Sequence, residues 1–434
     1  MVSARLRELL GLLPVGLLVT AGFTAVLISR TEEVSNLSLT YGAVFLGLCV
    51  FAHFFIRARL PDADPYLFPL AALLAAFGLV MIYRIDEELA RQQAQWFVLG
   101  LAFFCATVIL LRDHHSLERY RYTIAAASIV LLFMPRLPLI GAQTNGAYLA
   151  IKLGPVQFQP AEFAKVGIIV FLASYLAETR DVLVRGRVPR LSLKHFGPLL
   201  VVWGAAMLML VFIRDLGSSL MFFGGFLALL YVATSRISLV AVGAAMFAAG
   251  AAFFASNVSH ISDRISIWLD PFRPKVVDDE GYQIAQSLFA QADGGLFGTG
   301  FGRSLLELPG GGTILPAADT DLIYALIVNE LGLFGATAVV LVYLLFAARG
   351  FKVALLARDG FSKLLAAGLT AVFAMQVFVI VGGVTRVIPL TGVTLPFVSY
   401  GGSSIVANLV LLALLLIVSQ DARRDPERAH GGLA

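Results

Sequence analysis

The sequence predicts an all-α protein, a polytopic bundle of membrane-spanning helices. Of its 434 residues, 59% are apolar and only 14% are charged, and the mean hydropathy is +0.86. So little charge cannot cover the surface of a water-soluble protein of this length. The apolar residues also gather in long runs, and a helix of about 20 residues crosses the roughly 30 Å hydrocarbon core of a bilayer.

Twelve runs are long and apolar enough to be candidate spans. The fifth is the weakest, because Pro135 and Pro138 interrupt it and proline tends to end a helix. The first is too long for the core of a signal peptide and lacks a clear cleavage site, so we expect it to be retained. The runs are residues 9–28, 40–56, 65–83, 95–111, 122–140, 160–178, 195–213, 217–234, 237–256, 321–347, 362–384 and 398–419.

The placement of lysine and arginine indicates the orientation of these spans. With both termini assigned to the cytoplasm, 20 of the 32 Lys and Arg residues fall in cytoplasmic segments and 11 fall outside, while Lys165 lies within a span. This excess follows the positive-inside rule and favours twelve spans over eleven or thirteen. The pI near 9.1 therefore reflects membrane orientation, and no basic helix with interleaved aromatic residues indicates nucleic-acid binding.

Two segments assigned to the outside are longer than ordinary connections. Residues 257–320 contain too many aromatic and apolar residues for simple disorder. Within them, the stretch from Ile265 to Leu269 is a candidate amphipathic element at the membrane surface. Residues 141–159 are less apolar and lead directly into the motif QPAEFAK.

Several cofactor motifs are absent from the sequence. It contains no Walker motif, no HExxH motif and no Cys/His cluster, so we expect neither ATP-driven transport nor a dedicated zinc site. The Gly298-x-Gly300-x-Gly302 spacing follows no predicted strand and is therefore not interpreted as a dinucleotide turn. Neither a nucleotide nor a haem cofactor is expected, and the six histidines form no recognisable constellation in the sequence.

Ionisable residues within spans are the strongest physical indication of a site, because each costs about 2.5–3.5 kcal/mol to insert. Glu162 and Lys165 share one helix face at the outer end of a span, Asp215 lies at the tip of a helical hairpin, and Asp321 begins an apolar helix. On the predicted topology all four lie near the outer membrane face, which predicts a shared cavity. Glu330, some turns deeper, is expected to pair within the bundle.

Each of these groups also has a purely structural interpretation. Glu162 and Lys165 can simply neutralise each other, and Asp215 is a suitable N-cap for the helix that follows it. Asp319 is the natural N-cap for the apolar helix after it, with Asp321 in the first turn, where the helix dipole favours a carboxylate. Residue spacing alone does not decide between these interpretations and a reactive site.

Five motifs occur in order along the chain and resemble the SEDS family (shape, elongation, division and sporulation), which includes RodA and FtsW. The resemblance covers roughly residues 65–420. It implies a ten-helix integral membrane glycosyltransferase that polymerises lipid II into peptidoglycan glycan strands, with a class B penicillin-binding protein, a transpeptidase, as partner. The motifs are FQPAEFAK (158–165), DLGSS (215–219), LDPFRP with GYQIAQS (269–287), LPAADTDLIYALIVNELG (315–332) and GVTLPFVSYGGSS (392–404).

The resemblance also implies a division of the chain. Residues 1–60 are expected to hold two additional N-terminal transmembrane helices, residues 61–420 the SEDS-type core with the long extracytoplasmic loop 257–320, and residues 421–434 a cytoplasmic tail. An even number of added spans leaves the orientation of the core unchanged. The expected location is a bacterial plasma membrane, with both termini cytoplasmic and the active site outside.

The resemblance assigns roles to individual residues. Asp321 takes the position of the family's catalytic aspartate, and Asp319 stands where a histidine is usual. The residues 147–149, AYL, replace a common Arg-Trp-Leu, and Thr391 replaces a lysine frequent in the division branch, which favours the RodA-like elongation branch over an FtsW-like polymerase. The implied substrate-binding positions are Glu162, Lys165, Asp215, Arg264, Gln286, Ser399 and Ser403.

The implied chemistry is one displacement with Asp321 as the general base. Asp321 would accept the proton of the acceptor lipid II 4-hydroxyl as that oxygen attacks the anomeric carbon of the lipid-linked nascent glycan. Undecaprenyl pyrophosphate leaves without a proton, so no second carboxyl is needed as an acid. Lys165, Arg264, and Mg²⁺ or Mn²⁺ are candidate sources of positive charge for the leaving group.

Two other functions are compatible with charges in a membrane cavity. A flippase for a lipid-linked precursor would also need a polar cavity, but transporters commonly contain related halves, and the sequence shows no convincing internal repeat. A scaffold that recruits other proteins could use the tail QDARRDPERAHGGLA, although membrane orientation already explains its basic residues.

Overall fold

The computed structural model describes most of the chain. The described residues are 4–31, 36–111, 113–138, 141–144, 147–153, 156–185, 215–274, 276–279, 281–304, 306 and 313–424, with the single residues 197, 201, 204, 208 and 213.

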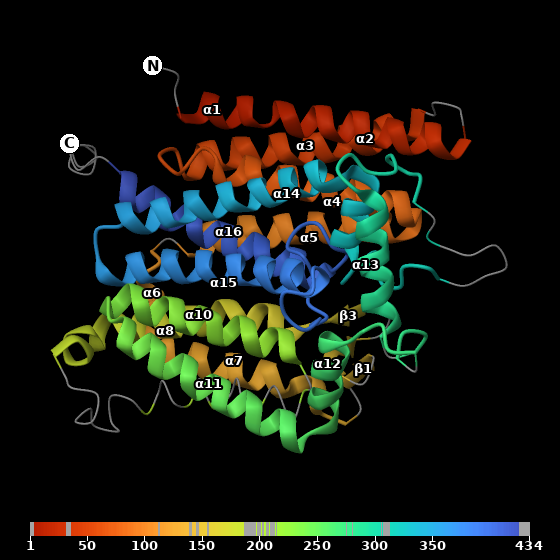
Figure 1. Cartoon of the computed structure of the whole chain (residues 1–434). Helices are drawn as coiled ribbons and strands as arrows, with labels where there is room; N and C mark the ends of the chain where they lie inside the picture. Colours follow the sequence, from red (N-terminus) through yellow and green to blue (C-terminus); the bar gives the residue numbers. More distant parts are fainter. Residues whose placement is uncertain are drawn as a thin grey trace.

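Within these residues the fold is a bundle of long, roughly aligned helices (Figure 1), as expected for an all-α membrane protein. Ten helical segments are long and apolar enough to cross a membrane. The elements are α1 Ala4–Gly11, α2 Leu13–Thr31, α3 Asn36–Arg59, α4 Leu67–Ile85, α5 Glu87–Leu110, α6 Ser116–Arg119, α7 Arg121–Phe133, the 3₁₀ helix η1 Met134–Arg136, β1 Gly141–Thr144, β2 Ala147–Leu153, β3 Val156–Phe158, α8 Pro160–Arg185, α10 Leu216–Thr234, α11 Ile237–Asn257, α12 Ser259–Leu269, α13 Tyr282–Gly294, α14 Ile323–Leu356, α15 Gly360–Val384 and α16 Gly402–Arg423.

Ten of the twelve predicted spans correspond to these ten segments. The predicted fifth span, 122–140, is a shorter helix: α7 has 13 residues and continues only as η1 through Pro135, because proline cannot continue the backbone hydrogen bonding. The predicted seventh span, 195–213, falls largely outside the described residues.

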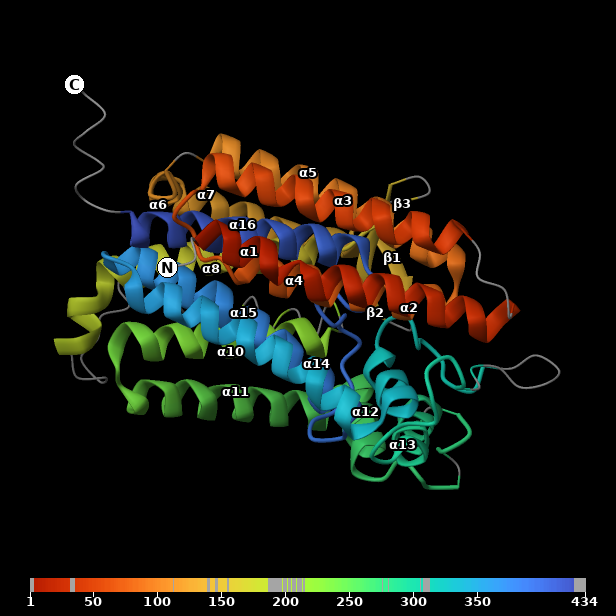
Figure 2. The same ribbon diagram turned by 90° about the horizontal axis from the view of Figure 1, so that it is seen from above.

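Helix α16 lies at the centre of the bundle and α11 at its edge. In the apolar window of α16, 94% of residues are buried inside the protein, against 6% in α11. Figures 1 and 2 show α16 enclosed by other helices, with α11 on one flank and α1 to α3 on the other. An apolar face exposed on an outer helix of a membrane protein is suited to lipid.

The two N-terminal membrane helices pack on the outside of α4 and α5. Phe23 of α2 meets Tyr83 of α4 edge to face, with ring centroids 4.9 Å apart, and Phe45 of α3 meets Phe97 of α5 at 4.8 Å. These contacts fix α2 and α3 against the rest of the bundle.

Compact structure closes one end of the bundle. Strands β1, β2 and β3 form a small antiparallel sheet in that order, which an all-helical prediction does not anticipate. In the long segment 257–320 the structure has α12 and α13. The predicted amphipathic stretch is part of α12, where Trp268 Nε1 donates a hydrogen bond of 3.1 Å to the carbonyl of Arg386.

A glycine-rich turn holds a break in α14. Gly332 has φ +68°, so the helix is interrupted there, and the backbone N–H groups of Thr299 and Gly300 donate to the carbonyls of Asn329 and Glu330 at 2.9 and 3.1 Å. Positive φ at Gly298, Gly300 and Gly302 allows this close approach. The spacing that superficially resembled a dinucleotide turn is therefore a helix-packing device.

Glu330 pairs within the bundle, as expected. Its Oε1 lies 3.1 Å from Arg84 Nη2 of α4, and its Oε2 accepts a hydrogen bond of 3.0 Å from the backbone N–H of Gly302. The buried carboxylate therefore ties α4, α14 and the glycine-rich turn together.

Candidate active site

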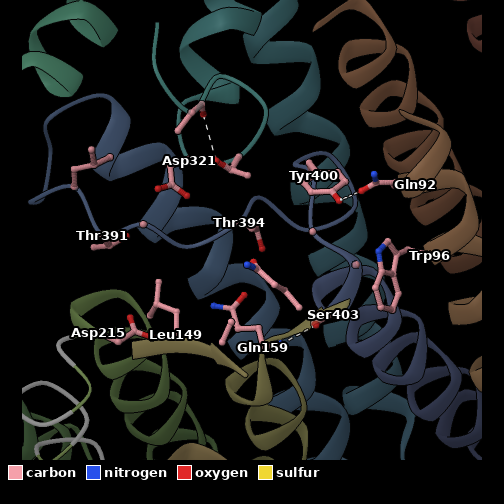
Figure 3. Close-up of a pocket in the computed structure, with 18 of the residues that line it drawn as sticks. Gln92, Trp96, Leu149, Gln159, Asp215, Asp321, Thr391, Thr394, Tyr400 and Ser403 are labelled. Carbon is pink, nitrogen blue, oxygen red and sulfur yellow. Dashed lines mark hydrogen bonds between the residues drawn. The ribbon is translucent and has the colours of Figure 1, made fainter. Parts of the chain in front are cut away.

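A cavity of about 970 Å³ lies at the end of the bundle that carries the sheet and α12. Its walls come from α5, from β2 and the segment leading into α8, from the start of α10, from α12 and α13, and from the segments before α14 and α16. Figure 3 shows Asp215 and Asp321 on one side of this space and Gln92, Trp96 and Ser403 on the other.

Asp321 lines this cavity from the segment that precedes α14. Burial raises the pKa of its carboxyl to about 6, the negative charge of Asp319 adds to the effect, and the positive charge of Arg264 opposes it. A carboxylate with such a pKa is mostly ionised at pH 7 and is more basic than an ordinary aspartate. This combination suits a general base.

Asp319 is not the N-cap of α14, contrary to the prediction. The helix begins at Ile323, and Leu322 occupies the cap position without a side-chain hydrogen bond. Residues 317–322 instead form a tight turn, in which Ala317 has φ +53° and its carbonyl accepts from the N–H groups of Thr320 and Leu322. This turn, rather than the first turn of a helix, carries Asp321.

Ser399 holds the turn from behind. Its side chain is 2% exposed, and its Oγ donates a hydrogen bond of 2.7 Å to the carbonyl of Thr320, the residue before Asp321. The same Oγ accepts from Leu395 N at 2.8 Å, and Tyr400 N donates to the carbonyl of Asp319 at 2.8 Å. The structure places Ser399 behind the cavity wall, so it positions Asp321 rather than lining the cavity.

Asp215 and Arg264 both line the cavity with Asp321. Asp215 is buried, and its side chain caps α10 by accepting a hydrogen bond of 2.9 Å from Ser218 N, so its structural interpretation is confirmed. Burial also raises the pKa of Asp215, against the opposing effects of the Ser218 hydrogen bond and the Arg264 charge. Arg264 Nη1 donates 2.8 Å to the carbonyl of Leu390, which holds the guanidinium at the cavity.

Glu162 and Lys165 lie close to the cavity but do not line it. Lys165 is fully buried, and its Nζ donates to Glu162 Oε2 at 2.6 Å, to Gln376 Oε1 at 2.7 Å and to Asn408 Oδ1 at 3.2 Å. An ammonium has three donors, and three acceptors already occupy them. The positive charge that acts on Asp321 therefore comes from Arg264 and not from Lys165.

The remaining predicted residues divide between the cavity and its surroundings. Ser403 lines the cavity, and its Oγ accepts a hydrogen bond of 2.9 Å from Gln159 N. Gln286 does not line it; the glutamine of α13 that does is Gln283, one turn earlier. The two glutamines lie on the same face of α13, one turn apart, so their spacing in the sequence does not tell which one reaches the cavity.

Further polar residues of the cavity are not indicated by the sequence. Thr391 and Thr394 line the cavity, and their buried hydroxyls have no hydrogen-bond partner in the described part of the chain. Tyr400 donates from its hydroxyl to Gln92 Oε1 at 2.6 Å (Figure 3). Gln92 precedes a long apolar run and Thr391 precedes the motif GVTLPFVSYGGSS, so the sequence gives no signal that either lines a cavity. Thr394 and Tyr400 lie within that motif, where nothing distinguishes them from their neighbours.

An apolar groove of about 280 Å³ adjoins the cavity. It lies between the N-terminal helices α2 and α3 and the core helices α4 and α5. Arg91 and Gln95 of α5 line both the groove and the polar cavity. The two spaces are therefore neighbours across one helix, one polar and one suited to hydrocarbon.

Relatives at substantial identity carry names that describe peptidoglycan synthesis. The peptidoglycan glycosyltransferase RodA of Mycobacterium tuberculosis (strain H37Rv) is 41% identical over 401 residues, which cover 89% of this chain and 84% of the relative. The peptidoglycan glycosyltransferase RodA of Mycobacterium leprae is 40% identical over 88% of this chain and 83% of the relative. The stage V sporulation protein E of Bacillus subtilis is 31% identical over 83% of this chain and 98% of the relative.

Solved structures share the fold. A chain from a peptidoglycan synthase complex that coordinates polymerization and crosslinking superposes with a TM-score of 0.66 at 28% identity, covering 84% of this chain and 99% of that one. The Thermus thermophilus rod shape determining protein RodA superposes with a TM-score of 0.58 at 26% identity, covering 84% of this chain and 98% of that one.

The family model FtsW/RodA/SpoVE, described as a cell cycle protein, matches residues 65–424. The matched segment begins just before α4, so α1 to α3 precede it. It contains the cavity and all the residues that the resemblance assigned to the site. The chain is a multi-pass membrane protein that belongs to the FtsW/RodA/SpoVE family.

Proposed function

We propose that this protein is a peptidoglycan glycosyltransferase that polymerises lipid II into glycan strands. The observation that carries the proposal is the meeting of Asp321, Asp215 and Arg264 in one cavity of about 970 Å³ at the end of a membrane bundle. The names of the mycobacterial relatives support the same activity. Their identities of 40–41%, against 28–30% for relatives named FtsW, favour the elongation branch.

In the proposed reaction Asp321 takes the proton from the 4-hydroxyl of the acceptor lipid II. The acceptor oxygen forms a bond to the anomeric carbon of the growing strand, and the bond from that carbon to the pyrophosphate oxygen breaks with inversion. The electron pair leaves with undecaprenyl pyrophosphate, which needs no proton. A pKa of about 6 keeps the carboxylate available at neutral pH while making it a useful proton acceptor.

Arg264 is the residue proposed to face the leaving pyrophosphate. It lines the cavity with Asp321, and a guanidinium matches phosphate oxygens well. Lys165 does not offer this contact, because it is buried and its three donors are occupied.

The cavity also suits a hard divalent cation. Asp215 and Asp321 offer carboxylate oxygens and Thr391 a hydroxyl, and oxygen donors are what Mg²⁺ and Mn²⁺ prefer. When bound there, such an ion would supply positive charge to the pyrophosphate.

The apolar groove is proposed to accommodate part of a lipid tail. The tail of a lipid-linked substrate stays in the bilayer while its sugars enter the polar cavity, so a route for hydrocarbon beside that cavity is required. The groove meets this need, because Arg91 and Gln95 border both spaces. Helices α2 and α3 would then form one wall of the tail route.

The proposed topology puts the cavity outside the cell and both termini in the cytoplasm. The start of α1 and the end of α16 lie at the bundle end opposite the sheet and α12 (Figure 1), so one orientation satisfies both assignments. The excess of Lys and Arg in the segments assigned to the cytoplasm supports this orientation. Labelling of single cysteines placed at residues 263 and 352 from either side of sealed vesicles tests it.

A class B penicillin-binding protein is the proposed partner. A structural neighbour belongs to a synthase complex that couples polymerization with crosslinking. Co-purification of the full chain with the transpeptidase from the same cell tests the pairing.

The decisive experiment measures glycan chains formed from purified lipid II by the full chain in detergent or nanodiscs. We expect Asp321→Ala and Asp321→Asn to abolish polymerisation. Asp263→Asn, an exposed carboxylate of α12, is the matched control and should retain activity. The melting temperature of Asp321→Asn should not fall, because burying an ionised carboxylate opposes folding.

Full activity of Asp321→Asn would contradict the assignment of the base. A wild-type protein that moves lipid II across vesicles but forms no glycan chains would instead support a flippase. Restoration of either elongation or division in depleted cells separates the two branches of the family.

A further inference from the structure

Four side chains with metal-binding groups meet at the bundle end opposite the cavity. His114 and His115 follow α5, Asp359 precedes α15, and Asp421 lies in the last turn of α16. One ligand atom from each lies within 4.8 Å of the others. The expectation that no histidine belongs to a constellation is therefore wrong for these two, because helix packing joins positions more than 300 residues apart in sequence.

Each histidine is oriented by a hydrogen bond from one ring nitrogen. His115 Nδ1 lies 2.7 Å from Glu118 Oε1, and His114 Nε2 lies 2.6 Å from Ser362 Oγ. The Asp113 carboxylate holds the backbone between α5 and α6 by accepting a hydrogen bond of 2.9 Å from His115 N. Histidines that bind metals characteristically have their second ring nitrogen held by a carboxylate or another polar group.

The spacing of the free donor atoms fits a shared ion. His115 Nε2 lies 3.6 Å from Asp359 Oδ2, which is too long for a hydrogen bond. Two ligands bound at about 2.0–2.1 Å to a tetrahedral zinc ion are separated by roughly 3.3–3.5 Å. The remaining ligand atoms lie within 4.8 Å of one another, so ion binding has to shorten those distances by about 1.5 Å at most. His114 is only 3% exposed, so the cluster has one buried wall.

We propose that His114, His115, Asp359 and Asp421 form a binding site for a divalent transition-metal ion of the zinc class. Two imidazoles favour Zn²⁺ and its neighbours over Mg²⁺ or Ca²⁺, and two carboxylates balance the charge of the ion. The ion joins the end of α5, the start of α15 and the end of α16. Helices α5 and α16 line the catalytic cavity at their other ends. A bound ion would therefore hold two of the helices that form the cavity in a fixed relative position.

Zn²⁺ binding to the tag-free full chain in detergent, after treatment with a chelator, tests the proposal. Competition with a chromophoric zinc chelator gives the stoichiometry and the dissociation constant. We expect wild type to bind one more tight equivalent than Asp421→Asn or His115→Gln, and Zn²⁺ to raise the melting temperature of wild type more than that of either variant. Glu118→Gln should weaken binding by about 10- to 100-fold, because it removes the carboxylate that orients His115.

A control variant separates this site from other carboxylates. Asp263→Asn, at an exposed position that belongs to neither site, should bind Zn²⁺ as wild type does. Asp421 is exposed, so Asp421→Asn should fold normally, with an unchanged melting temperature in the absence of metal. Equal Zn²⁺ binding by wild type and Asp421→Asn, or no tight binding by wild type, overturns the proposal.

Discussion

Lys165 Nζ donates a hydrogen bond of 2.6 Å to Glu162 Oε2 between two buried side chains. Gln376 joins the pair, because its Nε2 donates to Glu162 Oε1 at 3.3 Å and to the carbonyl of Thr394 at 2.9 Å. Thr394 lines the cavity. The ion pair therefore supports the cavity through one intermediate residue.

Removing one partner of this pair should destabilise the protein strongly. Lys165→Met leaves the Glu162 carboxylate buried without its cation, and breaking a buried pair in this way costs about 3–5 kcal/mol. We expect a lower melting temperature and reduced polymerisation. The double variant Glu162→Gln/Lys165→Met should recover part of the stability, because it leaves no unpaired charge. Lys352→Met, at an exposed position of α14, is the control, and an equal loss in both lysine variants would contradict the role of the pair.

The pH dependence of polymerisation should report the ionisation of Asp321. Its pKa of about 6 means that the base is protonated below that value, so kcat/KM should fall about tenfold per pH unit on the acid side. Asp319→Asn removes a negative charge that raises the pKa of Asp321, and should therefore move the acid limb to lower pH. Initial rates from pH 5 to 8 measure this, and a profile that is flat through pH 5 is incompatible with Asp321 as the base.

The two cavity threonines should matter for activity and not for folding. Their hydroxyls are buried without partners in the described structure, and an unsatisfied buried polar group costs about 1–3 kcal/mol. Thr391→Val and Thr394→Val should therefore keep or raise the melting temperature while lowering kcat/KM for lipid II. Thr107→Val, on the part of α5 that does not line the cavity, serves as the comparison for activity. Lower melting temperatures in both valine variants would show that the hydroxyls stabilise the fold.

The break in α14 should tolerate no side chain. A Cβ at Gly332 would lie 2.4 Å from Gly298 N, and the φ of +68° is itself unfavourable for an L residue. Gly332→Ala should lower stability by about 1–3 kcal/mol. Gly47→Ala, where a Cβ meets nothing within 4 Å, should be neutral or slightly stabilising. Thermal unfolding of the two variants measures the difference, and similar melting temperatures would contradict this account.

Part of the site could be found by sequence, because charged groups are costly in a membrane: Asp215 and Asp321 were indicated in this way, and both line the cavity. Arg264 also lines it, but only the family resemblance indicated that residue. Gln283 and Gln286 show the limit of the method, since they share a face of α13 one turn apart, and only the position of that helix along its axis decides which one lines the cavity. Ser399 shows a second limit, because membership in a motif does not tell whether a residue lines the cavity or lies behind the residues that do.

The sequence by itself determined the membrane class, ten of the spans and the family, since hydrocarbon thickness and the cost of buried charge act on local composition. Only the tertiary structure decided that Lys165 is sealed among three acceptors and that His114 and His115 meet Asp359 and Asp421. Those relationships depend on how helices are rotated and offset against one another. That arrangement is set by packing across the whole bundle, which no single segment encodes.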